Sequence, residues 1–146
     1  MDFDSIVMHY LAAQGLLLSP QFSVHAAGGE WSCPDFVALD FAKREIQVVE
    51  ITTAYNVGGL IEKIQNRQDQ WFRLLTPQLI ARGIPVYDWS TVVRAFVRRD
   101  RYSHVKSKFP DTPDVRLEVI EDITFPWTWP WDLWKAQLGA PLSLVG

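Results

Sequence analysis

Two neighbouring segments, Cys33-Pro-Asp-Phe-Val-Ala-Leu-Asp40 and Glu45-Ile-Gln-Val-Val-Glu-Ile-Thr-Thr53, decide the fold. Both are rich in apolar and β-branched residues, which favour strands, and a short reversal at 42–44 separates them. The two segments therefore predict a hairpin of strands at 35–41 and 45–53. Glu50 lies in the middle of the second, apolar strand, where an unpaired charge is costly. Glu50 is therefore expected to be a site residue, a paired structural carboxylate or an exposed strand residue.

The sequence on either side of the hairpin alternates between extended and helical patterns. In chain order we predict a helix at 4–18, strands at 22–26, 35–41 and 45–53, a long helix at 60–81, a strand at 91–97, a short helix at 101–109 and a strand at 115–121. This order favours an α/β fold with a mixed central sheet flanked by helices. The length of 146 residues is typical of a single domain, here 1–146.

The composition limits the possible functions. The chain is 48% hydrophobic and 21% charged, as expected for a soluble globular protein. Its formal charge of −3 provides no global positive field, so any nucleic-acid contact has to come from a local patch. Cys33 is the only cysteine, which fits a reducing cytoplasm and argues against a cysteine-based zinc site. The acidic start MDFDSIVMHY and the lack of a long apolar run predict neither export nor a membrane span.

The hairpin resembles the core of the PD-(D/E)XK nucleases, in which an aspartate follows a proline on one strand and an acidic residue lies on the next. Asp35 and Glu50 match these two carboxylates. The resemblance implies a restriction endonuclease-like fold and a Mg²⁺ or Mn²⁺ ion held by Asp35, Glu50 and the backbone carbonyl of Ile51. Hard oxygen ligands of this kind suit Mg²⁺, which activates water and polarises phosphoryl oxygens.

The chain departs from that family at one catalytic position, because Thr52 stands where the family usually has lysine. A threonine hydroxyl supplies hydrogen bonding only, without the positive charge. Lys63, early in the predicted long helix, is the expected substitute. At 100° per residue, Lys63 and Arg67 border the apolar stripe of that helix, while Gln68 projects near its middle. We therefore expect Arg67 and Gln68 to flank the site.

One segment concentrates positive charge between the fourth predicted strand and the end of the short helix. Tyr102 and His104 lie within it and offer planar groups for stacking on bases. A solvated basic face is the alternative interpretation. The expected nucleic-acid-binding residues are Arg94, Arg98, Arg99, Arg101, Lys106 and Lys108.

The C-terminal extension from about residue 124 contains the tryptophan-rich stretch FPWTWPWDLW. We expect a last helix at 131–138. The extension either caps the core or provides a surface for a homodimer or another protein partner, because tryptophan is enriched at interface hot spots.

These observations favour a metal-dependent phosphodiesterase acting on DNA or RNA. The missing lysine favours an alternative, a catalytically inactive nuclease-like fold that binds nucleic acid or protein. A small accessory protein that modulates another nuclease is a third hypothesis, compatible with the size alone. The sequence has neither a Gly-x-Ser-x-Gly elbow nor a phosphate-binding glycine loop, which argues against a serine hydrolase and a nucleoside triphosphatase.

Overall fold

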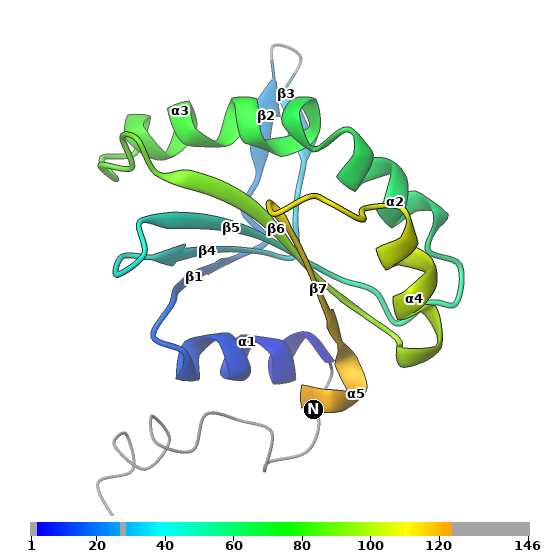
Figure 1. Ribbon diagram of the computed structural model, residues 1–146. Helices are drawn as coiled ribbons and strands as arrows, with labels where there is room; N and C mark the ends of the chain where they lie inside the picture. The colour runs from blue at the N-terminus through cyan, green and yellow to red at the C-terminus, as the bar shows by residue number, and fades with distance from the viewer. Residues whose placement is uncertain (1–2, 27–28, 124–146) are drawn as a thin grey trace, which may run out of the picture.

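A computed structural model describes residues 3–26 and 29–123 of the chain, and the tryptophan-rich extension lies outside this part (Figure 1). The elements are α1 (Phe3–Ala13), β1 (Leu17–Pro20), β2 (Val24–Ala26), β3 (Gly29–Ser32), β4 (Phe36–Asp40), β5 (Glu45–Ile51), α2 (Gly58–Gln65), the π-helical turn η1 (Gln68–Phe72), α3 (Arg73–Ala81), β6 (Ser90–Val97), α4 (Arg99–Ser107), β7 (Val115–Val119) and α5 (Ile120–Ile123). The predicted α/β fold with a mixed, helix-flanked sheet is confirmed.

The main sheet has five strands in the order β1-β4-β5-β6-β7. β4 pairs antiparallel with both β1 and β5, as the hairpin pattern predicts. β5, β6 and β7 run parallel to one another, so their carboxyl ends lie at the same edge of the sheet. In Figure 1 this is the edge near α2 and α4, and the β4–β5 turn lies at the opposite edge.

Helices cover both faces of this sheet and enclose two apolar cores (Figure 1). The larger core lies under α2, η1 and α3 and includes the fully buried Trp71 and Leu75. The smaller core lies between the sheet and α1 with α5, and its centre includes Val7, Leu11 and Phe96. The central strands are buried on both faces, which is typical of parallel strands between helical layers.

The beginning of the chain differs from the prediction. The first helix ends at Ala13 instead of continuing to about residue 18, because Gly15 adopts a positive φ of 82° that terminates the helix. Leu17 and Leu18 begin β1, which is an edge strand of the main sheet. The strand expected at 22–26 belongs instead to the separate β2–β3 hairpin. Helical spacing misled here because three consecutive leucines fit either pattern.

The predicted long helix is present as α2, η1 and α3, but its middle is wound as a π-helix. The extra residue in that turn changes which side chains face the sheet. Trp71 and Phe72 are buried side by side, and Trp71 Nε1–H donates to Ser32 Oγ at 3.0 Å. Gln68, expected near the middle of the apolar stripe, is exposed. That expectation was wrong because it assumed a uniform 100° per residue.

Within residues 3–26 and 29–123, none of the helices has the length and apolar character needed to cross a bilayer.

Candidate active site

Asp35 and Glu50 lie next to each other where the hairpin reaches the carboxyl edge of the parallel strands. Phe36 pairs with Val49 in antiparallel register, so Asp35 and Glu50 occupy the next cross-strand position. The N–H of Ile51 donates to Asp35 Oδ2 at 2.7 Å, which fixes the aspartate beside the end of β5. The structure thus brings together the two carboxylates that the sequence singled out.

The side chain of Glu50 is buried on the face that α2 and α3 cover. Strand alternation gives it this orientation, since Val48, two residues earlier, belongs to the core beneath those helices. Glu50 is only 7% exposed, and its Oε1 accepts no hydrogen bond from the part of the chain that the structure describes. Buried carboxylates are normally hydrogen-bonded, so the unmet oxygen makes Glu50 a candidate functional residue.

The protonation of Glu50 reflects this environment. Burial, together with the neighbouring negative charge of Asp35, raises the pKa of the Glu50 carboxyl from 4.5 to about 8. The positive charge of Lys63 acts in the opposite direction. At neutral pH the folded protein therefore holds a proton on Glu50 unless a cation replaces it.

Lys63 is placed beside the pair by α2. Its Nζ lies 3.8 Å from Glu50 Oε1, which is an ion-pair distance but too long for a hydrogen bond. For this reason Oε1 has an electrostatic partner and yet lacks a donor. The Lys63 side chain is 49% exposed, so its ammonium remains accessible to a ligand at the sheet edge.

Thr52 follows directly at the end of β5. Its N–H donates to the carbonyl of Phe96 at 3.0 Å, which extends the pairing with β6 by one residue. Its hydroxyl oxygen accepts the N–H of Ala54 at 3.3 Å. The hydroxyl thus supports a local turn, and its own proton is still available as a donor.

Arg67 and Gln68, expected to flank the site, have other surroundings. Arg67 makes a two-pronged ion pair with Asp114 at 2.5 and 3.1 Å and also donates to the carbonyl of Ile64. These contacts tie the long helix to the loop before β7. Gln68 begins the π-helical turn and lines a shallow hollow near Asp114 and Thr91. The structure does not bring either residue into contact with Asp35 or Glu50.

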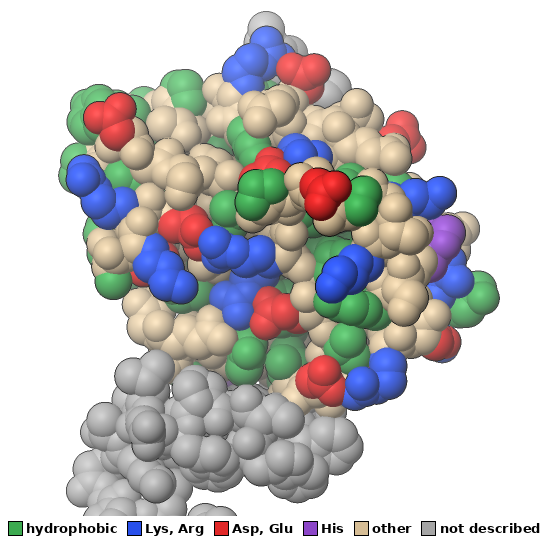
Figure 2. All heavy atoms as spheres, in the orientation of Figure 1, with side chains coloured by type: hydrophobic (Ala, Val, Ile, Leu, Met, Phe, Trp, Pro, Cys, Tyr) green, Lys and Arg blue, Asp and Glu red, His purple; other side chains and the backbone are tan. Residues whose placement is uncertain are grey.

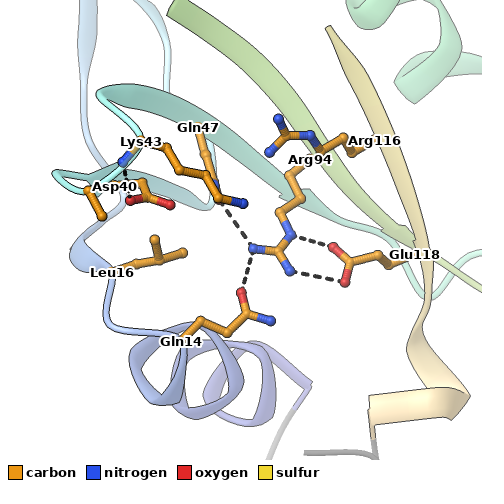
Figure 3. A pocket seen from close by; sticks show the side chains of 9 residues that line it. Gln14, Leu16, Asp40, Lys43, Gln47, Arg94, Arg116 and Glu118 are labelled. Atoms are coloured by element: carbon orange, nitrogen blue, oxygen red, sulfur yellow. Dashed lines mark hydrogen bonds and ion pairs between the residues drawn. The ribbon is translucent and has the colours of Figure 1, made fainter. Parts of the chain in front are cut away.

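The six basic residues expected to bind nucleic acid do not form one patch. Arg94 lies on the α1 face of the sheet and is only 8% exposed. Its guanidinium pairs with both carboxylate oxygens of Glu118 and donates to Gln14 Oε1 at 2.8 Å and Gln47 Oε1 at 3.3 Å (Figure 3). Arg94 lies in the wall of a hollow of about 610 Å³ as part of this polar network. Strand alternation separates it from the basic residues of α4.

The other five residues lie on α4 or at its two ends. Arg98 pairs with Asp100 at 2.7 Å, and Arg99 pairs with Asp122. Lys106 and Lys108 lie at the opposite end of the helix and are exposed. Figure 2 shows basic and acidic side chains interspersed over this face, without a continuous basic surface. Arg98, Arg99 and Arg101 lie at the start of α4, which is at the same edge of the sheet as Glu50.

Tyr55 belongs to this edge and was not predicted from the sequence. It lies in the loop between β5 and α2 and is 60% exposed. The Arg101 guanidinium carbon is 4.3 Å from the centroid of the Tyr55 ring, and that of Arg98 is 5.7 Å away. The available signal was an aromatic residue in the loop that directly follows the strand carrying Glu50.

The arrangement suits one divalent ion with a small number of protein ligands. Among the described residues no group of three or more His, Cys, Asp or Glu side chains is placed to hold a metal. Mg²⁺ is commonly held by one or two carboxylates while it keeps several waters, and the unmet Oε1 of Glu50 beside Asp35 fits that role. No family model, curated protein or solved structure matches this chain.

Proposed function

We propose that this protein is a metal-dependent phosphodiesterase that cleaves DNA or RNA, with its active site at Asp35, Glu50 and Lys63. The observation that carries the proposal is the contact between Glu50 and Lys63. A buried carboxylate beside a second carboxylate is costly to the fold, and the ammonium 3.8 Å away offsets only part of that cost. Such strain is expected where a cation and an anionic substrate bind.

The fold supports the same proposal. The PD-(D/E)XK nucleases also begin with a helix, followed by three strands, a helix and a further strand. Here α1, β1, β4, β5, the long helix and β6 follow that order, with the β2–β3 hairpin as an insertion. We therefore propose a restriction endonuclease-like fold in which Lys63 of α2 takes the role of the lysine that the family usually carries at the position of Thr52.

Each residue has a defined role in this proposal. Asp35 and Glu50 would hold Mg²⁺ or Mn²⁺, with the carbonyl of Ile51 as a further oxygen ligand. The ion would supply polarisation of a phosphoryl oxygen and a lowered pKa of water. The Lys63 ammonium would stabilise negative charge that develops on the phosphate. The remaining hydroxyl proton of Thr52 would donate to an oxygen at the reacting centre.

The test is cleavage of plasmid, linear duplex, single-stranded DNA and RNA in Mg²⁺ or Mn²⁺, together with calorimetric titration of each metal. We expect Asp35→Asn and Glu50→Gln to lose both cleavage and metal binding. Lys63→Met should retain metal binding and lose cleavage by about 100-fold or more, because one charge-stabilising group is typically worth this much.

Two matched controls keep this test specific. Asp40→Asn removes a carboxylate from the far end of β4, where Asp40 accepts the N–H of Lys43 in the hairpin turn. Lys108→Met removes an exposed lysine from the end of α4. Both variants should cleave like the wild type. Metal binding that survives in both Asp35→Asn and Glu50→Gln would contradict the proposal.

A catalytically inactive binding module is the second candidate. The observation that favours it is the engagement of the Thr52 hydroxyl with the N–H of Ala54, at the position where the family usually carries its lysine. Under this hypothesis the wild type binds nucleic acid in a gel shift and cleaves nothing in either metal.

A further inference from the structure

We infer that Tyr55 and Arg101, assisted by Arg98, form a subsite for single-stranded nucleic acid next to the carboxylate pair. This inference rests on the proposed function and names the form of nucleic acid that the site takes. The subsite lies at the carboxyl edge of β5 and β6, where the loop after β5 meets the start of α4 (Figure 1).

Arg101 differs from the two arginines that precede it on α4. Arg98 and Arg99 each pair with a carboxylate. Among the described residues Arg101 has no such partner, and its Nε is buried without a hydrogen bond. Its guanidinium carbon instead lies over the Tyr55 ring, 4.3 Å from the ring centroid. Its position over the aromatic ring restrains this guanidinium, and its terminal N–H groups match the oxygens of a phosphate.

The aromatic ring supplies the second half of the subsite. Tyr55 is 60% exposed although it is a large side chain in a short loop. Every base has a face that stacks on an aromatic ring, and this kind of contact requires an unpaired base. The Tyr55–Arg101 pair therefore matches the sugar-phosphate backbone and a base of one strand.

The position of the subsite fits a strand that also reaches the carboxylates. Ala95 lies opposite Glu50 in parallel register, and Arg98 follows three residues later. At 3.3 Å per residue this is about 10 Å along the strand direction. With the base spacing that one strand has in a stacked duplex, about 3.4 Å of axis per nucleotide, that distance corresponds to roughly three nucleotides.

The small number of cations argues against a duplex footprint. Lys63, Arg98, Arg99 and Arg101 are the cations placed at this edge by the contacts described above, and Arg98 and Arg99 already have carboxylate partners. Duplex-binding proteins commonly neutralise about 6–10 phosphates. With a formal charge of −3, the chain offers no broad field to make up the difference.

The test is fluorescence anisotropy of a labelled ten-nucleotide thymidine strand in EDTA, with the full chain and no cleavage. We expect Arg101→Gln to weaken binding and to reduce the slope of log affinity against log salt by about 0.7, the value for one phosphate contact on a single strand. Tyr55→Ala should weaken binding about 5- to 100-fold, as expected for one lost base stack, while Tyr55→Phe should retain it.

Two controls separate this subsite from general charge. Arg73→Gln removes an equally charged, exposed arginine from the start of α3 and should leave both the affinity and the salt slope unchanged. An abasic strand of the same length should lose the effect of Tyr55→Ala and keep that of Arg101→Gln. Equal weakening by Arg73→Gln and Arg101→Gln, or tighter binding of a blunt duplex of ten base pairs, would overturn the inference.

The outcome is independent of catalysis. Metal-dependent cleavage combined with unchanged binding by Arg101→Gln and Tyr55→Ala would sink the subsite and leave the nuclease standing. Binding that depends on both residues, without cleavage in either metal, would support the subsite and sink the phosphodiesterase.

Discussion

Each face of the main sheet carries a buried polar cluster. The carboxylates of one cluster are paired with arginines, whereas a carboxylate oxygen of the other has no hydrogen bond within the described residues. On the α1 face, Arg94 pairs with both oxygens of Glu118, and Arg116 pairs with both oxygens of Glu45 at 2.6 Å (Figure 3 shows the Arg94 pair). On the other face, Asp35 and Glu50 place two carboxyl groups side by side, with one ammonium 3.8 Å from Glu50.

The pKa directions of the two buried glutamates express this difference. Burial acts to raise the pKa of Glu45, but hydrogen bonds from Arg116 and Gln47 outweigh it, and the pKa is lowered. The pKa of Glu50 is raised to about 8 because burial and Asp35 dominate. The cluster with satisfied charges holds three strands and the turn after α1 together, whereas the cluster with an unmet oxygen is the candidate ligand site.

The largest effect on this comparison is expected from Arg94→Ala. The substitution would leave Glu118 without its arginine partner and remove the link from β6 to Gln14 in the turn after α1. We expect a loss of about 3 kcal/mol in the free energy of unfolding, because breaking a buried pair strands the other charge. Urea unfolding checks this. A loss below about 1 kcal/mol would show that the α1-face cluster is not structural.

A smaller effect of opposite sign is expected from Glu50→Gln in the absence of metal. Between pH 4.5 and about 8 the folded protein keeps a proton on Glu50 that the unfolded chain releases, so the free energy of unfolding of the wild type falls as pH rises. Glu50→Gln should remove this slope and stabilise the protein at pH 8 by about 1–3 kcal/mol.

Glu45→Gln is the matched control for that measurement. Its lowered pKa stabilises the fold above the unfolded value, and this contribution disappears as pH falls through the folded value. Glu45→Gln should therefore destabilise the protein at neutral pH. Urea unfolding over a pH series with all three proteins decides the matter, and destabilisation by both substitutions at pH 8 would contradict the contrast.

Lys63→Met should have a subtler effect. The Lys63 charge lowers the pKa of Glu50, so its removal should raise that pKa further and extend the falling limb of the stability curve to higher pH. The carboxyl carbon shift of Glu50 in an NMR titration gives the direct measurement. An unchanged titration midpoint would mean that the ammonium does not act on Glu50 in solution.

The smallest change is expected from Arg73→Ala. Arg73 and Asp69 form an exposed ion pair one helical turn apart, and such pairs contribute less than about 0.5 kcal/mol. Urea unfolding should place this variant within error of the wild type. It provides the baseline for losing an arginine that belongs to neither cluster.

The sequence predicted the parts of this site that depend on short-range pattern. A Pro-Asp start and an acidic residue on adjacent strands predicted that Asp35 and Glu50 would meet, because a hairpin register follows from the chain itself. The placement of Lys63 followed from helical spacing over the first turns of α2.

The sequence could not predict features that depend on contacts between distant segments. Arg94 belonged to a basic run in the sequence, but Glu118 and Gln14, far away along the chain, bury it on the other face. The contact of Tyr55 with Arg101 depends on how the loop after β5 folds against α4, which the local sequence pattern does not specify. The roles proposed for Arg98, Arg99, Arg101, Lys106 and Lys108 in nucleic-acid binding remain predictions.

The π-helical turn sets the phase between the two halves of the long helix. With one residue fewer, α2 would be rotated by about 100° relative to α3, since an α-helix turns by that angle per residue. α3 keeps its orientation through Leu75 and Leu79 in the larger core, so the rotation would fall on α2 and carry Lys63 away from Glu50. The single extra residue therefore lets α3 pack against the larger core while α2 directs Lys63 toward Glu50.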